Sequence, residues 1–215
     1  GLLEYEPVND PVPYKDQVLA VGYGQAYMSA DDVRYDAGSN VIMQYEVALC
    51  DVKPVNPETT VVGFVFGGKD GEENVKYGTF AGYDYNSKSW VIGNFGWENG
   101  CTDIFASAPY EWTLPNTDES AGALVPATWH RLTLKIEGKK ASLYVDGALA
   151  VETEKDCITV PANSEDPKFN KLAPILYNCG KAIVDNIKFT TDLTFNIEKN
   201  TGNVDLADYN ISTTD

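Results

Sequence analysis

Apolar and polar side chains alternate with a period of two residues in short runs along most of the chain. In residues 132–137, Leu132, Leu134 and Ile136 alternate with polar neighbours. Because successive side chains of a strand point to opposite faces of its sheet, this period predicts a strand with one buried face. Residues 41–49 repeat the pattern and predict a second long strand with one mainly apolar face.

Turn residues separate these runs. Asp146 and Gly147 stand between residues 143–145 and a third run that starts at Ala148, and both tolerate the positive φ of a two-residue hairpin turn. Residues 60–66 are apolar on both faces, as in a central strand covered on each side. Further strands are predicted at residues 18–21, 25–29, 77–85, 89–95, 172–177, 182–189 and 193–197. No window sustains a helical period, so the sequence predicts an all-β domain with few or no helices.

The alternation fails between Trp97 and Pro126. This segment is rich in Gly, Pro, Asn and Ser, and loops of this length inside a compact domain are uncommon and tend to be functional or disordered. Disordered segments are poor in aromatic residues, whereas this one contains several. We therefore expect it to be ordered, and it could include a short helical turn.

Two stretches of the sequence resemble a known superfamily. One runs from Trp129 to Ile136 and, after a short turn, from Leu143 to Gly147; the other is residues 182–189. Together they are similar to the concanavalin A-like lectin/glucanase superfamily, in particular to its laminin-G-like and bacterial carbohydrate-binding members, over about residues 40–189. The resemblance implies an antiparallel two-sheet β-sandwich of the jelly-roll type that is usually extracellular and often binds sugars. The superfamily also contains glycoside hydrolases and purely adhesive domains.

The size of the chain is consistent with a single sandwich. A chain of 215 residues, 43% of them hydrophobic, can build one large β-sandwich core. We assign residues 1–190 to this domain and residues 191–215 to a C-terminal strand and polar tail, whose composition fits a linker to another module of a longer protein. The apolar runs are too short to span a bilayer, so no membrane insertion is predicted. The protein is expected to be secreted or on the cell surface, with any signal peptide already removed.

The charge of the chain narrows the choice of ligands. Acidic residues outnumber basic ones by 32 to 16, which gives a formal net charge of −16. Such a field repels phosphate backbones, so no nucleic-acid partner is predicted, and strongly anionic membranes and polysaccharides are disfavoured. Neutral poly- or oligosaccharides and divalent cations remain. The acidity could equally serve only to keep the domain soluble.

A cluster of aromatic residues is the predicted carbohydrate site. Sugar rings have apolar C–H faces and a rim of hydroxyls, which suit an exposed aromatic platform with amides and carboxylates nearby. The candidates are close together in the sequence: Tyr83, Tyr85, Trp90, Trp97, Tyr110 and Trp112. The alternative is that these rings are ordinary core residues, because tyrosine and tryptophan favour strands in any case.

A second candidate site is a structural calcium ion. Asp185 is in phase with the apolar residues of its predicted strand, so it points toward the core and needs a cation or hydrogen-bond partners. In similar jelly-roll sugar modules an aspartate at this position often helps bind calcium together with an acid near the N-terminus, here Glu6 or Glu4. The alternative is that Asp185 accepts hydrogen bonds from backbone N–H groups.

The remaining chemistry points away from catalysis. His130, the only histidine, is in register with Leu132 and Leu134, which favours a satisfied, semi-buried side chain. The Glu-x-Asp-x-x-Glu string that the resemblance would imply for a glycosidase is absent.

The four cysteines lack metal-site spacing, and either disulfides or free thiols fit them. The sequence thus favours a noncatalytic, lectin-like carbohydrate-binding module of a bacterial protein. A structural or adhesive protein-interaction domain and a glycoside hydrolase are the alternatives.

Overall fold

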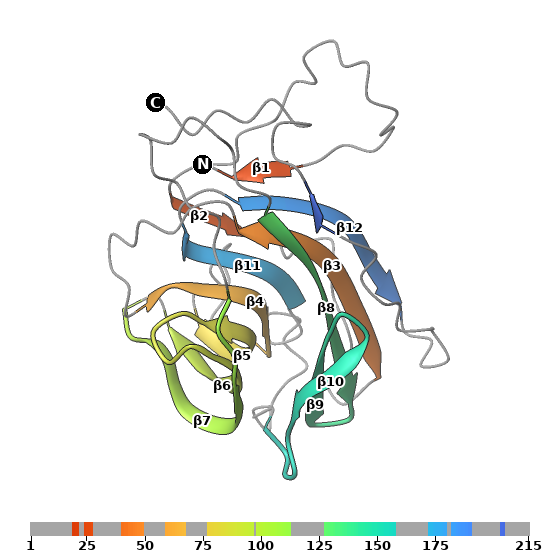
Figure 1. The fold of residues 1–215 in the computed structure, drawn as a ribbon. Helices are drawn as coiled ribbons and strands as arrows, with labels where there is room; N and C mark the ends of the chain where they lie inside the picture. The colour runs from red at the N-terminus through yellow and green to blue at the C-terminus, as the bar shows by residue number, and fades with distance from the viewer. Residues whose placement is uncertain are drawn as a thin grey trace.

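The computed structural model describes residues 19–21, 24–27, 40–49, 59–67, 77–96, 98–112, 127–157, 172–179, 182–190 and 203–204. These residues form antiparallel strands joined by turns, with no α-helix among them (Figure 1). None of them belongs to a helix of the length and hydrophobicity needed to cross a membrane. The predicted all-β class is confirmed.

The strands form two sheets. The seven-stranded sheet has the order β1-β12-β3-β8-β9-β10, with β13 paired to β8. Its strands are β1 (Leu19–Val21), β3 (Val41–Leu49), β8 (Ala127–Glu137), β9 (Lys140–Val145), β10 (Ala148–Glu152), β12 (Ala182–Thr190) and β13 (Asn203–Val204). The six-stranded sheet has the order β2-β11-β4-β5-β6-β7. Its strands are β2 (Gly24–Tyr27), β4 (Val61–Phe66), β5 (Tyr77–Asp84), β6 (Ser89–Gly96), β7 (Gly100–Pro109) and β11 (Leu172–Cys179).

The chain passes repeatedly from one sheet to the other, so that the strand order within each sheet differs from the sequence order. The result is the two-sheet antiparallel β-sandwich that the sequence predicts (Figure 1). Each sheet ends in a strand from a hairpin, β7 in one and β10 in the other, and these two edge strands contact each other. One side of the sandwich is therefore bounded by two sheet edges.

The main core lies between the sheets. It contains the alternate residues of β3 that the sequence assigns to a buried face, together with Leu132, Leu134 and Ile136 of β8. Tyr45 of β3 connects the two sheets. Its hydroxyl donates a hydrogen bond to the Gly63 carbonyl of β4 at 2.9 Å, and its ring meets that of Phe64 edge-on with the centroids 5.0 Å apart. The tyrosine is thus buried without leaving its polar group unpaired.

A second apolar cluster lies on the other face of the six-stranded sheet. It contains Val61 and Val65 of β4 together with Phe80, Val91, Phe95, Ile175 and Tyr177. The prediction that residues 60–66 form a strand buried on both faces is confirmed, since every residue of β4 is buried.

Residues 41–49 form the predicted long strand, and its mainly apolar face lies in the core. Ile42, Gln44 and Ala48, on the opposite face of β3, are buried as well. The polar residues on this face pair with β8: Gln44 Oε1 accepts from the Thr133 hydroxyl at 3.0 Å, and Glu46 forms an ion pair with Arg131. Alternation of polarity did not indicate exposure here, because hydrogen-bonded partners on neighbouring strands allow polar groups to be buried.

The expectation of an irregular segment after Trp97 is wrong for residues 100–109, which form the edge strand β7. It pairs with β6 from Ser89↔Pro109 to Gly96↔Gly100. Backbone hydrogen bonds hold this strand, and most of its side chains are exposed or small, so it carries no strong apolar alternation. The predicted strand at residues 193–197 lies outside the described residues.

Candidate functional site

Five of the six aromatic residues predicted to bind carbohydrate lie in one cluster. Tyr83 is at its centre, with ring centroids 5.1 Å from Trp90, 5.4 Å from Trp112 and 6.1 Å from Tyr110. The Tyr83 hydroxyl donates to the Tyr110 carbonyl at 3.1 Å and accepts from the Trp112 backbone N–H at 3.4 Å. Tyr85 packs edge-on against Tyr83 at 6.5 Å. Trp97 lies outside the described residues.

Burial divides this aromatic cluster. Tyr83, Trp90 and Trp112 are only 1%, 3% and 4% exposed, whereas Tyr85 and Tyr110 are partly exposed. A sugar could meet the three buried rings only if they left the core, so their position favours a structural role. Sugar binding by any of the six remains a prediction.

His130, the sole histidine, lies against this aromatic cluster. The His130 Nδ1 lies 2.6 Å from Asp146 Oδ2, and its Nε2 lies 3.0 Å from the Tyr110 hydroxyl. The His130 and Trp112 rings meet edge-on, with their centroids 4.5 Å apart. The second oxygen of Asp146 accepts the Arg131 backbone N–H at 2.8 Å. We call the chain of hydrogen bonds through Asp146, His130 and Tyr110 the polar clasp.

Burial affects the phenol of the polar clasp. Burial raises the pKa of Tyr110, with the nearby Asp146 carboxylate adding to the effect, so the phenol stays protonated at neutral pH. His130 Nδ1 is hydrogen-bonded to the Asp146 carboxylate, and Nε2 is hydrogen-bonded to the Tyr110 hydroxyl. The clasp therefore joins the end of the six-stranded sheet to β8 and the β9–β10 turn. The prediction of a satisfied histidine is confirmed, and the side chain is buried rather than semi-buried.

A bulge in β7 creates a different surface. The register between β6 and β7 shifts between Ile92 and Asn94, which pair with Ala106 and Thr102 respectively, so residues 103–105 all lie opposite Gly93. Asp103, within this bulge, has a φ of 45°, a left-handed conformation that aspartate tolerates better than most residues. Its carboxylate accepts a hydrogen bond from Asn94 Nδ2 at 3.1 Å.

The bulge depends on a glycine opposite it. A Cβ at position 93 would lie 2.9 Å from the Thr102 carbonyl oxygen and 3.0 Å from Ile104 Cδ1. The bulge can therefore pack over β6 only because residue 93 is a glycine and has no side chain. Its two apolar residues, Ile104 and Phe105, are 46% and 44% exposed. Bulges often redirect side chains beside functional sites.

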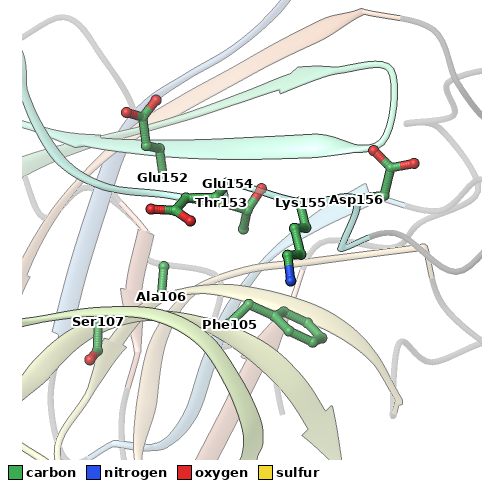
Figure 2. A pocket seen from close by; sticks show the side chains of 8 residues that line it. All are labelled: Phe105, Ala106, Ser107, Glu152, Thr153, Glu154, Lys155 and Asp156. Carbon is green, nitrogen blue, oxygen red and sulfur yellow. The ribbon is translucent and has the colours of Figure 1, made fainter.

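Phe105 borders a hollow between β7 and the segment that follows β10. This edge hollow has a volume of about 450 Å³ and is lined by Phe105, Ala106, Ser107, Glu152, Thr153, Glu154, Lys155 and Asp156 (Figure 2). In Figure 2 the Lys155 side chain extends toward Phe105, while Glu152 and Asp156 point away from it. Its volume lies within the range of small-molecule sites.

The wall of the edge hollow opposite Phe105 is firmly held. The backbone N–H of Thr153 donates to the Ala141 carbonyl at 2.9 Å, and the Thr153 hydroxyl accepts from the Ala141 N–H at 3.1 Å. Further along, the Cys157 N–H donates to the Lys139 carbonyl at 2.9 Å and its carbonyl accepts from the Thr79 hydroxyl. Residues 153–157 are thus fastened to β9 and to the other sheet, so the wall is formed before any ligand arrives.

The charged side chains of the wall are uncommitted. Glu152, Glu154, Lys155 and Asp156 are exposed and form no side-chain hydrogen bond or ion pair in the described structure. Other described ions do pair, as Lys88 does with Glu111 and Lys135 with Glu137. The wall therefore offers both acceptors and a donor to a ligand.

The predicted calcium site is not described by the structure. The backbone of Asp185, in β12, pairs with Glu46 of β3, but the Asp185 side chain and the whole of Glu6 lie outside the described residues. Among the side chains that are described, no group of three acidic, histidine or cysteine residues is arranged to hold a metal ion. Calcium binding by Asp185 and Glu6 remains a prediction.

Sequence reasoning did not select the residues of the edge hollow. Phe105 lies in the segment where the alternation fails, which marked the region but not the residue. In the sequence, residues 152–156 are polar and contain no glycosidase motif. Their meeting depends on which strands form the sheet edges, and only the topology contains that information.

The sequence matches no protein-family model and no curated protein. In structure the chain is similar to the carbohydrate-binding module CBM66 from Bacillus subtilis, with a TM-score of 0.50 and 13% identity over 80% of this chain and 85% of that one. Sheep galectin-11 gives a TM-score of 0.43 at 9% identity, over 79% of this chain and 98% of the galectin. A mutant sialidase of Trypanosoma rangeli gives 0.45 at 12% identity, over 77% of this chain but only 22% of the sialidase.

These similarities concern the fold. The two-sheet sandwich is the architecture that the resemblance to the concanavalin A-like lectin/glucanase superfamily implies, and this expectation is confirmed. Function must be argued from a site, because one sandwich fold serves many functions.

Proposed function

We propose that this chain is a noncatalytic carbohydrate-binding domain of a secreted or cell-surface protein. The observation that carries the proposal is the edge hollow, where an exposed aromatic ring stands beside uncommitted carboxylates and an ammonium group. An apolar ring face with acceptors and donors at its rim is the combination that a sugar requires.

Two further observations support this proposal. The chain shares its fold with a protein that is itself a carbohydrate-binding module, CBM66. The sequence also lacks the acidic string of the superfamily's glycosidases, which favours binding without hydrolysis.

Affinity electrophoresis tests the function. The purified chain is run through native gels containing soluble neutral glucans, mannans, galactans, xylans or fructans, each with added calcium and with a chelator. We expect retardation by at least one neutral polysaccharide and no release of reducing sugar on long incubation. A mobility unchanged in every gel would overturn the proposal.

The comparison of calcium with a chelator tests the predicted calcium site separately. If Asp185 and Glu6 hold a structural calcium ion, the chelator should lower the melting temperature of the protein even in the absence of sugar, since a bound ion stabilises only the folded state. An unchanged melting temperature would count against the calcium site without affecting the glycan proposal.

A structural or adhesive spacer is the second candidate. The burial of Tyr83, Trp90 and Trp112 favours it, because these rings fill the core and form no open platform. A domain that is not retarded by any polysaccharide, yet unfolds cooperatively, is the outcome this alternative predicts.

A further inference from the structure

We infer that the edge hollow is the sugar-binding site, with Phe105 as its stacking platform and Glu154 and Lys155 as its hydrogen-bonding wall. The ligand class is a neutral saccharide without carboxylate or sulfate groups. This inference rests on the proposed function and assigns its site to residues outside the buried aromatic cluster.

Phe105 is the described aromatic ring best placed to stack on a sugar. At 44% exposure it is accessible to solvent, unlike the buried rings of Tyr83, Trp90 and Trp112. An exposed phenylalanine on an edge strand is otherwise unfavourable, since apolar edges invite aggregation. The bulge that displays it includes a left-handed aspartate, a conformation that costs free energy and tends to persist at functional sites.

Glu154 and Lys155 supply opposite hydrogen-bonding roles. A carboxylate accepts from sugar hydroxyls and an ammonium group donates to them, and a hydroxyl can do both. Because neither side chain has an ion-pair partner among the described residues, a ligand does not have to displace one. Thr153 contributes less, since its hydroxyl is committed to Ala141.

The charges around the hollow select the class of saccharide. Three carboxylates and one ammonium line it, and the whole chain has a formal net charge of −16. Uronic acids and sulfated sugars are repelled by this field, whereas an uncharged sugar is not. A neutral ligand gains its affinity from stacking and from directional hydrogen bonds.

The bulge acts as the positioning element for Phe105. The hydrogen bond from Asn94 to Asp103 ties the start of the bulge to β6, two residues before the ring. Loss of this bond frees the bulge to move and lowers affinity while leaving the core intact, so Asn94 is a positioning residue. It does not contact the sugar itself.

Four variants test this inference in the polysaccharide gels, with the dissociation constant measured by titration calorimetry on the neutral polysaccharide that retards the wild type. Phe105→Ala should weaken binding at least about tenfold, as expected for a central aromatic contact. Phe105→Trp should preserve binding because it keeps an aromatic face. Glu154→Gln should weaken binding by a smaller factor, and Asn94→Ala should weaken it with no change in melting temperature.

Matched controls come from exposed apolar residues that do not line the hollow. Ile104→Ala alters the same bulge, and Leu149→Ala alters β10, where the side chain is 47% exposed. Both should bind like the wild type. Circular dichroism and the melting temperature confirm that each variant folds, which is expected since Phe105 lies at the surface.

The outcomes separate the site from the function. Wild-type binding that persists in Phe105→Ala overturns the site and leaves the glycan proposal standing. A wild type that binds nothing overturns both. A clear preference for an acidic or an amine-bearing polysaccharide overturns the neutral class, and loss of binding in Phe105→Ala but not in Ile104→Ala supports the inference.

Discussion

Asp146 combines two structural roles in one side chain. It occupies the first position of the β9–β10 turn with a φ of 53°, and its carboxylate orients His130 and accepts the Arg131 N–H. The buried imidazole of His130 has no other described partner for its Nδ1, so the carboxylate determines whether this polar group is satisfied. The turn residue thereby also fixes the inner end of the aromatic cluster.

Asp146→Ala should therefore destabilise the domain by about 2–3 kcal/mol, because a buried N–H loses a charged acceptor and alanine is strained at positive φ. Asp146→Asn keeps one acceptor and tolerates the turn, so about 1 kcal/mol is expected. Chemical denaturation measures both values, with Leu149→Ala in the same hairpin as the control. Equal unfolding free energies for wild type and Asp146→Ala would show that the polar clasp does not stabilise the fold.

The turn could be predicted from the sequence, whereas the polar clasp could not. Asp146 and Gly147 adopt positive φ as their residue types indicate. The partners His130 and Tyr110 are 16 and 36 positions away from Asp146, and no local pattern states that strand pairing and sheet packing bring them together. The sequence indicates that a buried His130 needs hydrogen-bond partners, but it does not identify them.

The thiols of Cys101 and Cys157 are free, and burial raises the pKa of both. Iodoacetamide at neutral pH should thus label these two sites slowly in the folded protein and quickly in denaturant, as peptide mass spectrometry would report. A raised folded pKa gives stability that is complete below the ordinary thiol value of about 8.5 and is lost as the pH rises toward the folded values. Fast labelling of the folded protein at neutral pH would contradict this prediction.

At the scale of the element, β7 combines a register shift with two exposed apolar side chains, Ile104 and Phe105. Its partner β6 provides Gly93 at the position where the bulge crosses. The elements that were predicted correctly, such as β4, have strong apolar runs. β7 carries only Ala106 and Ala108 toward the core, and two extra residues interrupt its pairing with β6 between its two halves. Small inward-facing residues and an interrupted ladder removed the signal on which the prediction depended.

Gly93→Ala should disrupt the bulge, because its Cβ would press on the Thr102 carbonyl. A cost of about 1–3 kcal/mol is expected, as for overpacking, together with weaker sugar binding through displacement of Phe105. Gly138→Ala is the comparison: it has a φ of 62° but open space around its Cβ, so it should cost about 1 kcal/mol from backbone strain and leave sugar affinity unchanged. Unaltered sugar affinity in Gly93→Ala would show that the bulge does not position Phe105 for binding.

For the molecule as a whole, charge should affect the choice of ligand but not the strength of binding. A neutral sugar exchanges no counterions, so raising the salt from about 0.05 M to about 0.5 M should change its dissociation constant less than about twofold. Calorimetry at the two salt concentrations measures this, with an acidic polysaccharide as the negative control. A steep loss of affinity with salt would indicate an ionic ligand.

The residues between the sheets and those of the edge hollow differ in how strongly they depend on their neighbours. Between the sheets, the side chains form one buried cluster, so a change there disturbs its neighbours. The exposed residues 154–156 of the edge hollow, by contrast, are attached to backbone that is already fixed by Ala141, Lys139 and Thr79, and Phe105 is attached to the edge strand β7. Randomising positions 105, 152, 154, 155 and 156 should therefore yield libraries in which most members still fold, and the domain could serve as an engineering scaffold whose specificity is selected independently of its stability.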